Sequence, residues 1–158
     1  MGIEALYCQP QTTQRHRGHA PYVLRNLSMT HSNQVWASDV SYIPMAHGFV
    51  YLTVILDWYS RRVLAWRVSV TMDVELIMVA LEEALETYVC PAIMNTDQGS
   101  QYTSARFIQA HQDQGIQVSM DGKGAWRDNI FVERLWRSVK YEDIYLHAYE
   151  TPNEVKQG

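Results

Sequence analysis

Three carboxylic acids stand where segments of different character meet along this chain. Asp39 lies inside an apolar stretch, Asp97 follows a second one, and Glu133 lies near the start of an amphipathic segment. Clustered carboxylates repel one another unless a cation neutralises them, and hard oxygen ligands suit magnesium or manganese. Two such ions about 3.5–4 Å apart can clamp both oxygens of an in-line phosphoryl displacement. The pattern therefore predicts a site that cuts nucleic acid.

Three strands are predicted around the first of these acids. Residues 35–43 are rich in β-branched and aromatic side chains and are followed by Pro44. Residues 49–56 form a nearly continuous apolar run, which is typical of a strand buried on both faces. Apolar residues alternate over residues 63–70. Because the connections are short, we expect an antiparallel meander.

After residue 70 the apolar period changes to that of a helix. Val74, Ile77, Met78, Leu81 and Leu85 recur at helical spacing. Helices and short strands then alternate to the end of the chain. The elements expected are a helix over 72–88, a strand over 92–94, a helix from a Ser104 cap to near Gly115, a strand over 116–119, a helix over 129–141 and a helix beginning at Pro152.

Four stretches of the chain carry recognisable motifs, and they are residues 33–43, 96–102, 119–124 and 128–142. Together and in this order they resemble the catalytic core of the DDE transposases, the insertion-sequence group related to retroviral integrases. The resemblance implies an α/β fold of the ribonuclease H-like class. That fold has a five-stranded mixed sheet, three antiparallel strands followed by two parallel ones, flanked by helices.

The resemblance also divides the chain. Residues 1–33 are interpreted as an extended basic arm, and residues 34–158 as the integrase or transposase catalytic core. Relatives carry a helix-turn-helix region upstream of the arm and a further helix after the core. Since the helix expected at Pro152 reaches Gly158 within about two turns, the core is expected to be truncated at its carboxyl end.

By resemblance, Asp39, Asp97 and Glu133 form the catalytic and metal-binding triad, holding magnesium or manganese as two ions. No small-molecule cofactor is implied. Each acid also has a plainer interpretation: Asp97 as a turn residue, and Glu133 as a surface acid paired with Arg137. A plainer interpretation fits Asp39 less well, because an unpaired charge inside a buried strand is costly and a cation would compensate it.

Candidate DNA contacts surround these acids. Glu133, Arg137 and Lys140 are spaced to lie on one helix face, although a solvated face would show the same pattern. Lys123 lies between two glycines, which favours either close approach to a phosphate or a plain hinge. The remaining candidates follow the second acid, and are Gln98, Gln101 and Tyr102. Three tryptophans, Trp36, Trp66 and Trp136, are interpreted as core residues.

The net charge of −4 alone argues against a polynucleotide partner, but the charge is unevenly distributed. Residues 123–141 carry a net charge of +3 beside the third acid, where a phosphate backbone needs cations. The chain contains no apolar run of membrane-spanning length and does not begin with a secretory pattern. We therefore expect a cytoplasmic protein with no membrane contact.

The sequence thus predicts a transposase catalytic core that performs metal-dependent 3′-end cleavage and strand transfer on DNA. Its expected partners are transposon ends and target DNA, with a homodimer or higher oligomer as the assembly. Two alternatives stay open. One is an inactive remnant that only binds DNA or dimerises, and the other is a ribonuclease H-like nuclease.

Overall fold

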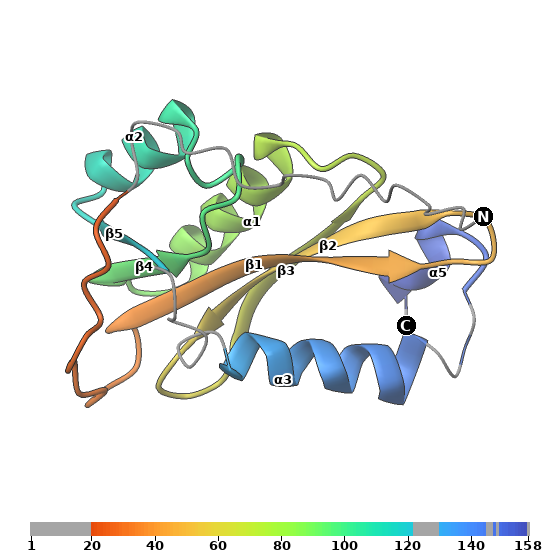
Figure 1. Cartoon of the computed structure of the whole chain (residues 1–158), viewed down its shortest axis with the longest axis horizontal. Helices are drawn as coiled ribbons and strands as arrows, with labels where there is room; N and C mark the ends of the chain where they lie inside the picture. The colour runs from red at the N-terminus through yellow and green to blue at the C-terminus, as the bar shows by residue number, and fades with distance from the viewer. Residues whose placement is uncertain (1–19, 122–129, 145–146, 148, 158) are drawn as a thin grey trace, which may run out of the picture.

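The structure, a computed structural model, describes residues 20–121, 130–144, 147 and 149–157. Its centre is a five-stranded sheet in the order β3-β2-β1-β4-β5 (Figure 1). The strands are β1 (Val35–Pro44), β2 (Phe49–Asp57), β3 (Val63–Ser69), β4 (Ile93–Thr96) and β5 (Gln117–Met120).

The first three strands form the antiparallel meander predicted from their short connections. β1 pairs with β2 from Trp36 opposite Asp57 to Pro44 opposite Phe49. β4 then lies parallel to β1, but only along Val35–Ala37, and β5 lies parallel to β4. The mixed five-stranded sheet is therefore confirmed. The rest of β1 extends beyond β4, so Asp39, in the middle of β1, lies just past the end of the parallel pairing.

Helices cover both faces of this sheet. Helices α1 (Val74–Thr87) and α2 (Ala105–Asp113) lie on one side, and α3 (Ile130–Ser138) lies on the other (Figure 1). Each side has its own apolar cluster, because alternate strand residues point to opposite faces. Trp36 and Ile55 pack toward α1 and α2, whereas Ala37 and Val54 belong to the cluster that contains residues of α3.

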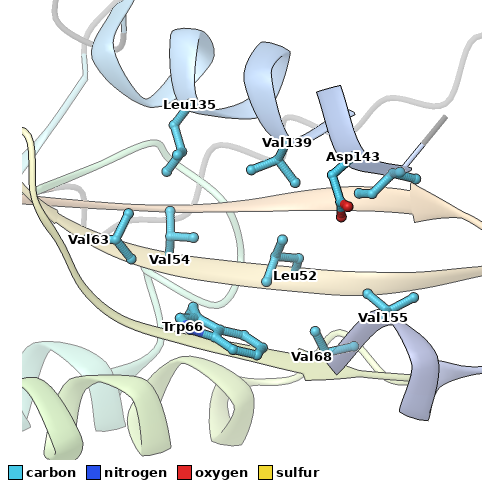
Figure 2. A pocket seen from close by; sticks show the side chains of 10 residues that line it. Leu52, Val54, Val63, Trp66, Val68, Leu135, Val139, Asp143 and Val155 are labelled. Carbon is cyan, nitrogen blue, oxygen red and sulfur yellow. The ribbon is translucent and has the colours of Figure 1, made fainter. Parts of the chain in front are cut away.

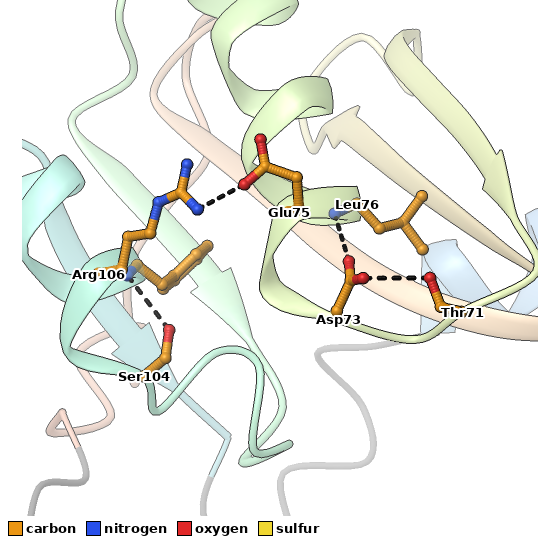
Figure 3. Close-up of polar contacts among 7 residues, drawn as sticks. Thr71, Asp73, Glu75, Leu76, Ser104 and Arg106 are labelled. Carbon is orange, nitrogen blue, oxygen red and sulfur yellow. Dashed lines mark hydrogen bonds and ion pairs between the residues drawn. The ribbon is translucent and has the colours of Figure 1, made fainter.

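Side-chain caps define where the two helices on the first side begin. Asp73 accepts a hydrogen bond from the backbone N–H of Leu76 at 3.1 Å, and Ser104 accepts one from Phe107 at 3.2 Å (Figure 3). These caps satisfy backbone donors that the first helical turn leaves unpaired. An ion pair between Glu75 and Arg106 joins the two helices near these ends.

Helix α3 differs from its prediction at its carboxyl end. It continues as a π-helical segment, η1 (Val139–Ile144). In a π-helix the backbone bonds join residues five apart, so side chains five apart lie more nearly on one face than they do in an α-helix. Ile144 is buried and Val139 packs against the same cluster, so the wider turn lets both side chains face the sheet.

The prediction that Trp66 is a core residue is wrong. Its side chain is 43% exposed and lines an apolar pocket of about 420 Å³ between β2, β3 and the α3–η1 segment (Figure 2). Trp66 lies on β3, an edge strand. Helix α3 packs on β1, so it does not cover this end of the sheet fully. The short helix α5 (Pro152–Gln157) contributes Val155 to the far side of the pocket.

The described part of the predicted arm contacts the core. Leu24 is buried in the cluster beneath α3, and the backbone N–H of Val23 donates to the Ser119 hydroxyl at 3.2 Å. Residues 1–19, most of the predicted arm, lie outside the described residues. In the part of the chain that is described, no helix has the length and apolar character needed to cross a bilayer.

His111 gives the fold a dependence on pH. The side chain is fully buried, and its Nδ1 lies 2.7 Å from the Phe107 carbonyl oxygen. Its Nε2 has no partner among the described residues. Burial lowers the pKa of His111 from its usual 6.5 more than the Phe107 contact raises it. Protonation would therefore place an unpaired charge in the core.

We predict that His111→Leu weakens the loss of stability on acidification. Because the folded pKa is lowered, the contribution of His111 is present above its unfolded pKa and is lost as pH falls through the folded value. Urea unfolding of both proteins from about pH 7.5 to about pH 5 measures this. The wild type should lose more stability than the variant over that interval, and parallel curves would contradict the prediction.

Candidate active site

The sheet register places three aspartates side by side. Ala37 pairs with Asn95 across β1 and β4, so Asp39, two residues on, points to the same face as Asp97. Thr96 pairs with Met120 across β4 and β5, so the next residues, Asp97 and Asp121, are also neighbours. The backbone N–H of Asp121 continues this pairing by donating to the Thr96 carbonyl at 2.9 Å.

Asp39 is the most constrained of these acids. The indole Nε1 of Trp136 donates to its Oδ2 at 2.7 Å, which joins β1 directly to α3. The pKa of Asp39 is raised from 3.8 to about 6. Burial is the main cause, and the negative charges of Asp97 and Asp121 add to it, while the Trp136 bond opposes it. A buried carboxylate with acidic neighbours favours either a proton or a cation.

Asp97 lies in the turn that follows β4. Although the residue reaches solvent, surrounding protein raises the pKa of its carboxyl group, and a bond from the backbone N–H of Gly99 at 2.8 Å partly opposes this. A Cβ on Gly99 would lie 2.9 Å from both Asp97 Oδ1 and Gln101 Oε1. The absence of a side chain at Gly99 therefore allows this close turn.

Asp121 was not predicted as a site residue. Its Oδ1 accepts a hydrogen bond from Asn95 Nδ2 at 3.0 Å, and its backbone carbonyl accepts one from Gln98 Nε2 at 2.8 Å. Asn95 is only 1% exposed. The signal available in the sequence was positional, since Asp97 and Asp121 each directly follow a short strand.

Glu133 lies in the first turn of α3 and is exposed. It is three residues before Trp136 on the same helix, so the two side chains lie on adjacent turns of one face. The Trp136 bond therefore brings the Glu133 helix to the Asp39 strand. Within the described residues, however, no three His, Cys, Asp or Glu side chains are placed so that they could hold one metal ion together. The structure brings Asp39 and Asp97 together, and it places Glu133 on the helix that the Trp136 bond joins to Asp39.

The predicted DNA contacts lie in different environments. Arg137 is exposed and Lys140 is partly exposed, and both follow Glu133 along α3 and η1. Gln98 is partly buried and donates to the Asp121 carbonyl. Lys123 lies outside the described residues.

Tyr102 and Gln101 have little surface to offer a ligand. Tyr102 is 2% exposed, its hydroxyl lies 3.0 Å from the Ser38 hydroxyl, and burial raises its pKa well above the usual value. Gln101 is also buried. The prediction that these two residues contact DNA does not fit this burial. They were predicted as DNA contacts because they follow Asp97 in the sequence, but the chain folds so that both side chains are buried.

The fold and the paired carboxylates define a ribonuclease H-like domain with an acidic site at the carboxyl ends of its parallel strands. Residues 29–125 match the model of the family described as integrase core domain. The chain therefore belongs to the integrase core domain family, as its motifs indicated.

The sequence relatives are transposases. The chain is 37% identical over 130 residues to the transposase for insertion sequence element IS904 of Lactococcus lactis, covering 81% of this chain and 51% of the relative. It is 32% identical over 148 residues to the putative transposase for IS986/IS6110 of Mycobacterium tuberculosis, covering 80% and 52%. The chain thus spans about half the length of these curated relatives.

Solved structures confirm the fold. The catalytic core domain of BIV integrase superposes with a TM-score of 0.62 at 16% identity, covering 78% of each chain. The HTLV-2 integrase catalytic core domain, in complex with magnesium in a dimeric form, gives a TM-score of 0.58 at 22% identity. That comparison covers 69% of this chain and 68% of the other.

We predict that Asp39→Asn stabilises the metal-free protein near neutral pH. Because the folded pKa of Asp39 is raised, its contribution to stability is fully present below the unfolded pKa of 3.8 and is lost as pH rises through about 6. Asparagine keeps an oxygen for Trp136 and removes the charge, so the gain near pH 7 should be on the order of 1–3 kcal/mol. Urea unfolding near pH 7 and near pH 4 measures the difference, which should shrink at the lower pH. An equal difference at both would remove the carboxylate charge as its cause.

Proposed function

We propose that this chain is a transposase catalytic core that performs metal-dependent DNA 3′-end cleavage and strand transfer. The observation that carries the proposal is the crowded Asp39–Asp97 pair, joined to the Glu133 helix by the Trp136 bond. Membership of the integrase core domain family and the transposase relatives support it.

The donor set of this site fits a divalent cation. Asp39 and Asp97 offer carboxylate oxygens on one face of the sheet. Burial raises the pKa of both groups, and neighbouring acids add to the rise at Asp39. Magnesium or manganese bound there would neutralise the carboxylate charge and polarise a phosphate oxygen. Glu133 is the third proposed ligand, and we propose two ions as in the two-metal scheme. Trp136 would act on a bound ion indirectly, because its bond to Asp39 fixes the orientation of that carboxylate.

The proposed reaction has two displacements at phosphorus. In the first, water attacks a phosphodiester at the element end, one P–O bond forms, and the bond to the leaving 3′-oxygen breaks. The freed 3′-hydroxyl then attacks a phosphorus atom of the target DNA. A new P–O bond joins the element end to the target, and one P–O bond of the target strand breaks. Asp39, Asp97 and Glu133 would hold the cations, which supply the positive charge that stabilises the transition state, and no covalent enzyme intermediate forms.

We predict manganese- or magnesium-dependent nicking of plasmid DNA and joining of an oligonucleotide with a free 3′-hydroxyl to that plasmid. Asp39→Asn and Glu133→Gln should each abolish both products, because each removes a proposed ligand. Gel separation of nicked and joined species reads both reactions at once. Glu142→Gln is a matched control, since it removes a carboxylate from the same helical segment at a solvent-exposed position.

Each alternative has its own outcome in this assay. Nicking without joining would favour a ribonuclease H-like nuclease over a transposase. DNA binding with neither product would favour the inactive remnant. Activity that survives Asp39→Asn would remove this site from the chemistry.

We also propose that DNA, as element end and as target, lies along α3. Arg137 follows Glu133 at i+4 on α3, and Lys140 follows at i+7 in η1, which continues that helix. Assembly as a dimer or higher oligomer belongs to the same proposal, and the HTLV-2 core, which has a dimeric form, is its structural precedent.

We predict that replacing Arg137 and Lys140 by alanine weakens DNA binding on every sequence alike. Each lost phosphate contact should flatten the slope of log affinity against log salt by about one. Fluorescence anisotropy with two unrelated duplexes over a salt series measures this. A salt slope that neither substitution changes would remove this face of α3 from the DNA interface.

A further inference from the structure

The turn between β2 and β3 holds an arginine in an unusual backbone conformation. Arg61 has a φ of 65°, in the left-handed region that favours glycine or asparagine. Two backbone bonds of 2.9 Å fix this turn, from the N–H of Arg61 to the Asp57 carbonyl and from the N–H of Asp57 to the Arg62 carbonyl. Keeping a long side chain at this φ costs about 1–2 kcal/mol. Backbone strain of this kind is concentrated at functional sites in proteins.

The Arg61 side chain is directed at the start of the proposed catalytic helix. Its guanidinium carbon lies 2.9 Å from the centre of the Phe131 ring, in the first turn of α3. Trp58, from the same turn as Arg61, packs edge-on against that ring with centroids 6.1 Å apart. Stacking on an aromatic face holds a guanidinium in place and leaves its N–H groups available to an anion.

A second guanidinium lies nearby. Arg134 is three residues after Phe131, so it lies one turn further along the same side of α3. Both arginines are exposed. The pKa of Arg61 is lowered, first by partial burial and then by the positive charge of Arg134. Arg134 also directly follows Glu133 in the chain.

Neither arginine is neutralised by a close acid within the described ranges. The ion pairs found there involve Arg67, Arg106 and His147. Asp57 attracts Arg61, but its carboxylate oxygens already accept bonds from the backbone N–H of Asn33 at 2.8 Å and from Ser60 at 2.6 and 2.9 Å. The two guanidiniums therefore share a region of positive charge beside Glu133.

We propose that Arg61 and Arg134 together bind the phosphate backbone of DNA as it enters the site at Glu133. Two neighbouring guanidiniums without close acidic partners match an anionic ligand with several acceptor oxygens. This inference rests on the proposed function, and it adds the β2–β3 turn to an interface that the sequence pattern confined to α3 and the loops beside it.

The test is DNA binding by the whole chain, measured by fluorescence anisotropy with a short labelled duplex over a salt series. Arg61→Asn removes the charge and suits the left-handed conformation, so the variant should fold. It should bind about ten-fold more weakly and flatten the salt slope by about one. Arg134→Gln, on the helix surface, should do the same. Arg61→Lys keeps the charge and should retain most of the slope.

Arg62→Asn is the matched control. Arg62 is the next residue in the same turn and is also exposed, but its guanidinium lies over Tyr88, 5.3 Å from the ring centre. The substitution therefore changes the net charge equally at a different site. It should leave affinity and slope close to those of the wild type.

The outcomes separate this inference from the function on which it rests. Arg61→Asn and Arg62→Asn weakening binding equally would overturn the inference, since net charge alone would then explain both. The inference also fails if Arg61→Asn and Arg134→Gln bind like the wild type while the Arg137 and Lys140 variant is weakened, a result that leaves the proposed function standing. A wild-type chain that binds no duplex at any salt would contradict both.

Discussion

The burial of acidic side chains next to one another is the constraint on which the candidate site depends. Asp39 and Asp97 lie on one face of adjacent parallel strands, and Asp121 adds to the negative field that Asp39 experiences. Burial strengthens that field because little water screens it. The fold tolerates the arrangement through fixed donors, which are the Trp136 indole, the Gly99 amide and the Asn95 side chain. Each donor stabilises one carboxylate by a hydrogen bond but carries no charge, so the negative charge remains for a cation to neutralise.

The same bonds explain how distant parts of the chain form one site. β1 supplies the central acid, the turn after β4 supplies the second, and α3 is joined to the first through one indole N–H. The Trp136 bond is short and partly buried, so it orients the Asp39 carboxylate and positions the helix at once. Trp136 therefore has two roles. The sequence pattern predicted only its packing in the core, and the structure adds its bond to Asp39.

Much of the fold was predictable because its signals are local. The helical period and the Asp73 cap define α1, and the apolar run of β2 indicates a strand buried on both faces. What was not predictable depends on contacts distant in sequence. The burial of Tyr102, the exposure of Trp66 on an edge strand and the role of Asp121 all follow from which strands are neighbours.

The candidate site divides in the same way. Motif order predicted Asp39, Asp97 and Glu133 as site residues. No sequence signal predicted that Arg61 lies near Arg134, which follows it by more than seventy residues. Residue type gives the chemistry a side chain is capable of, and the chain's path through space decides which side chains share a surface.

The pairing of β1 with β4 also governs which changes of length this domain can accept. Side chains alternate between faces along a strand, so a single residue inserted between Val35 and Asp39 would turn the carboxylate toward the cluster that contains Trp36 and Ile55. The turn between β1 and β2 can accept insertions, because Met45–Gly48 lies beyond the segment of β1 that pairs with β4. Relatives that differ in length should therefore vary at the far end of the hairpin and keep the spacing from Val35 to Asp39 fixed.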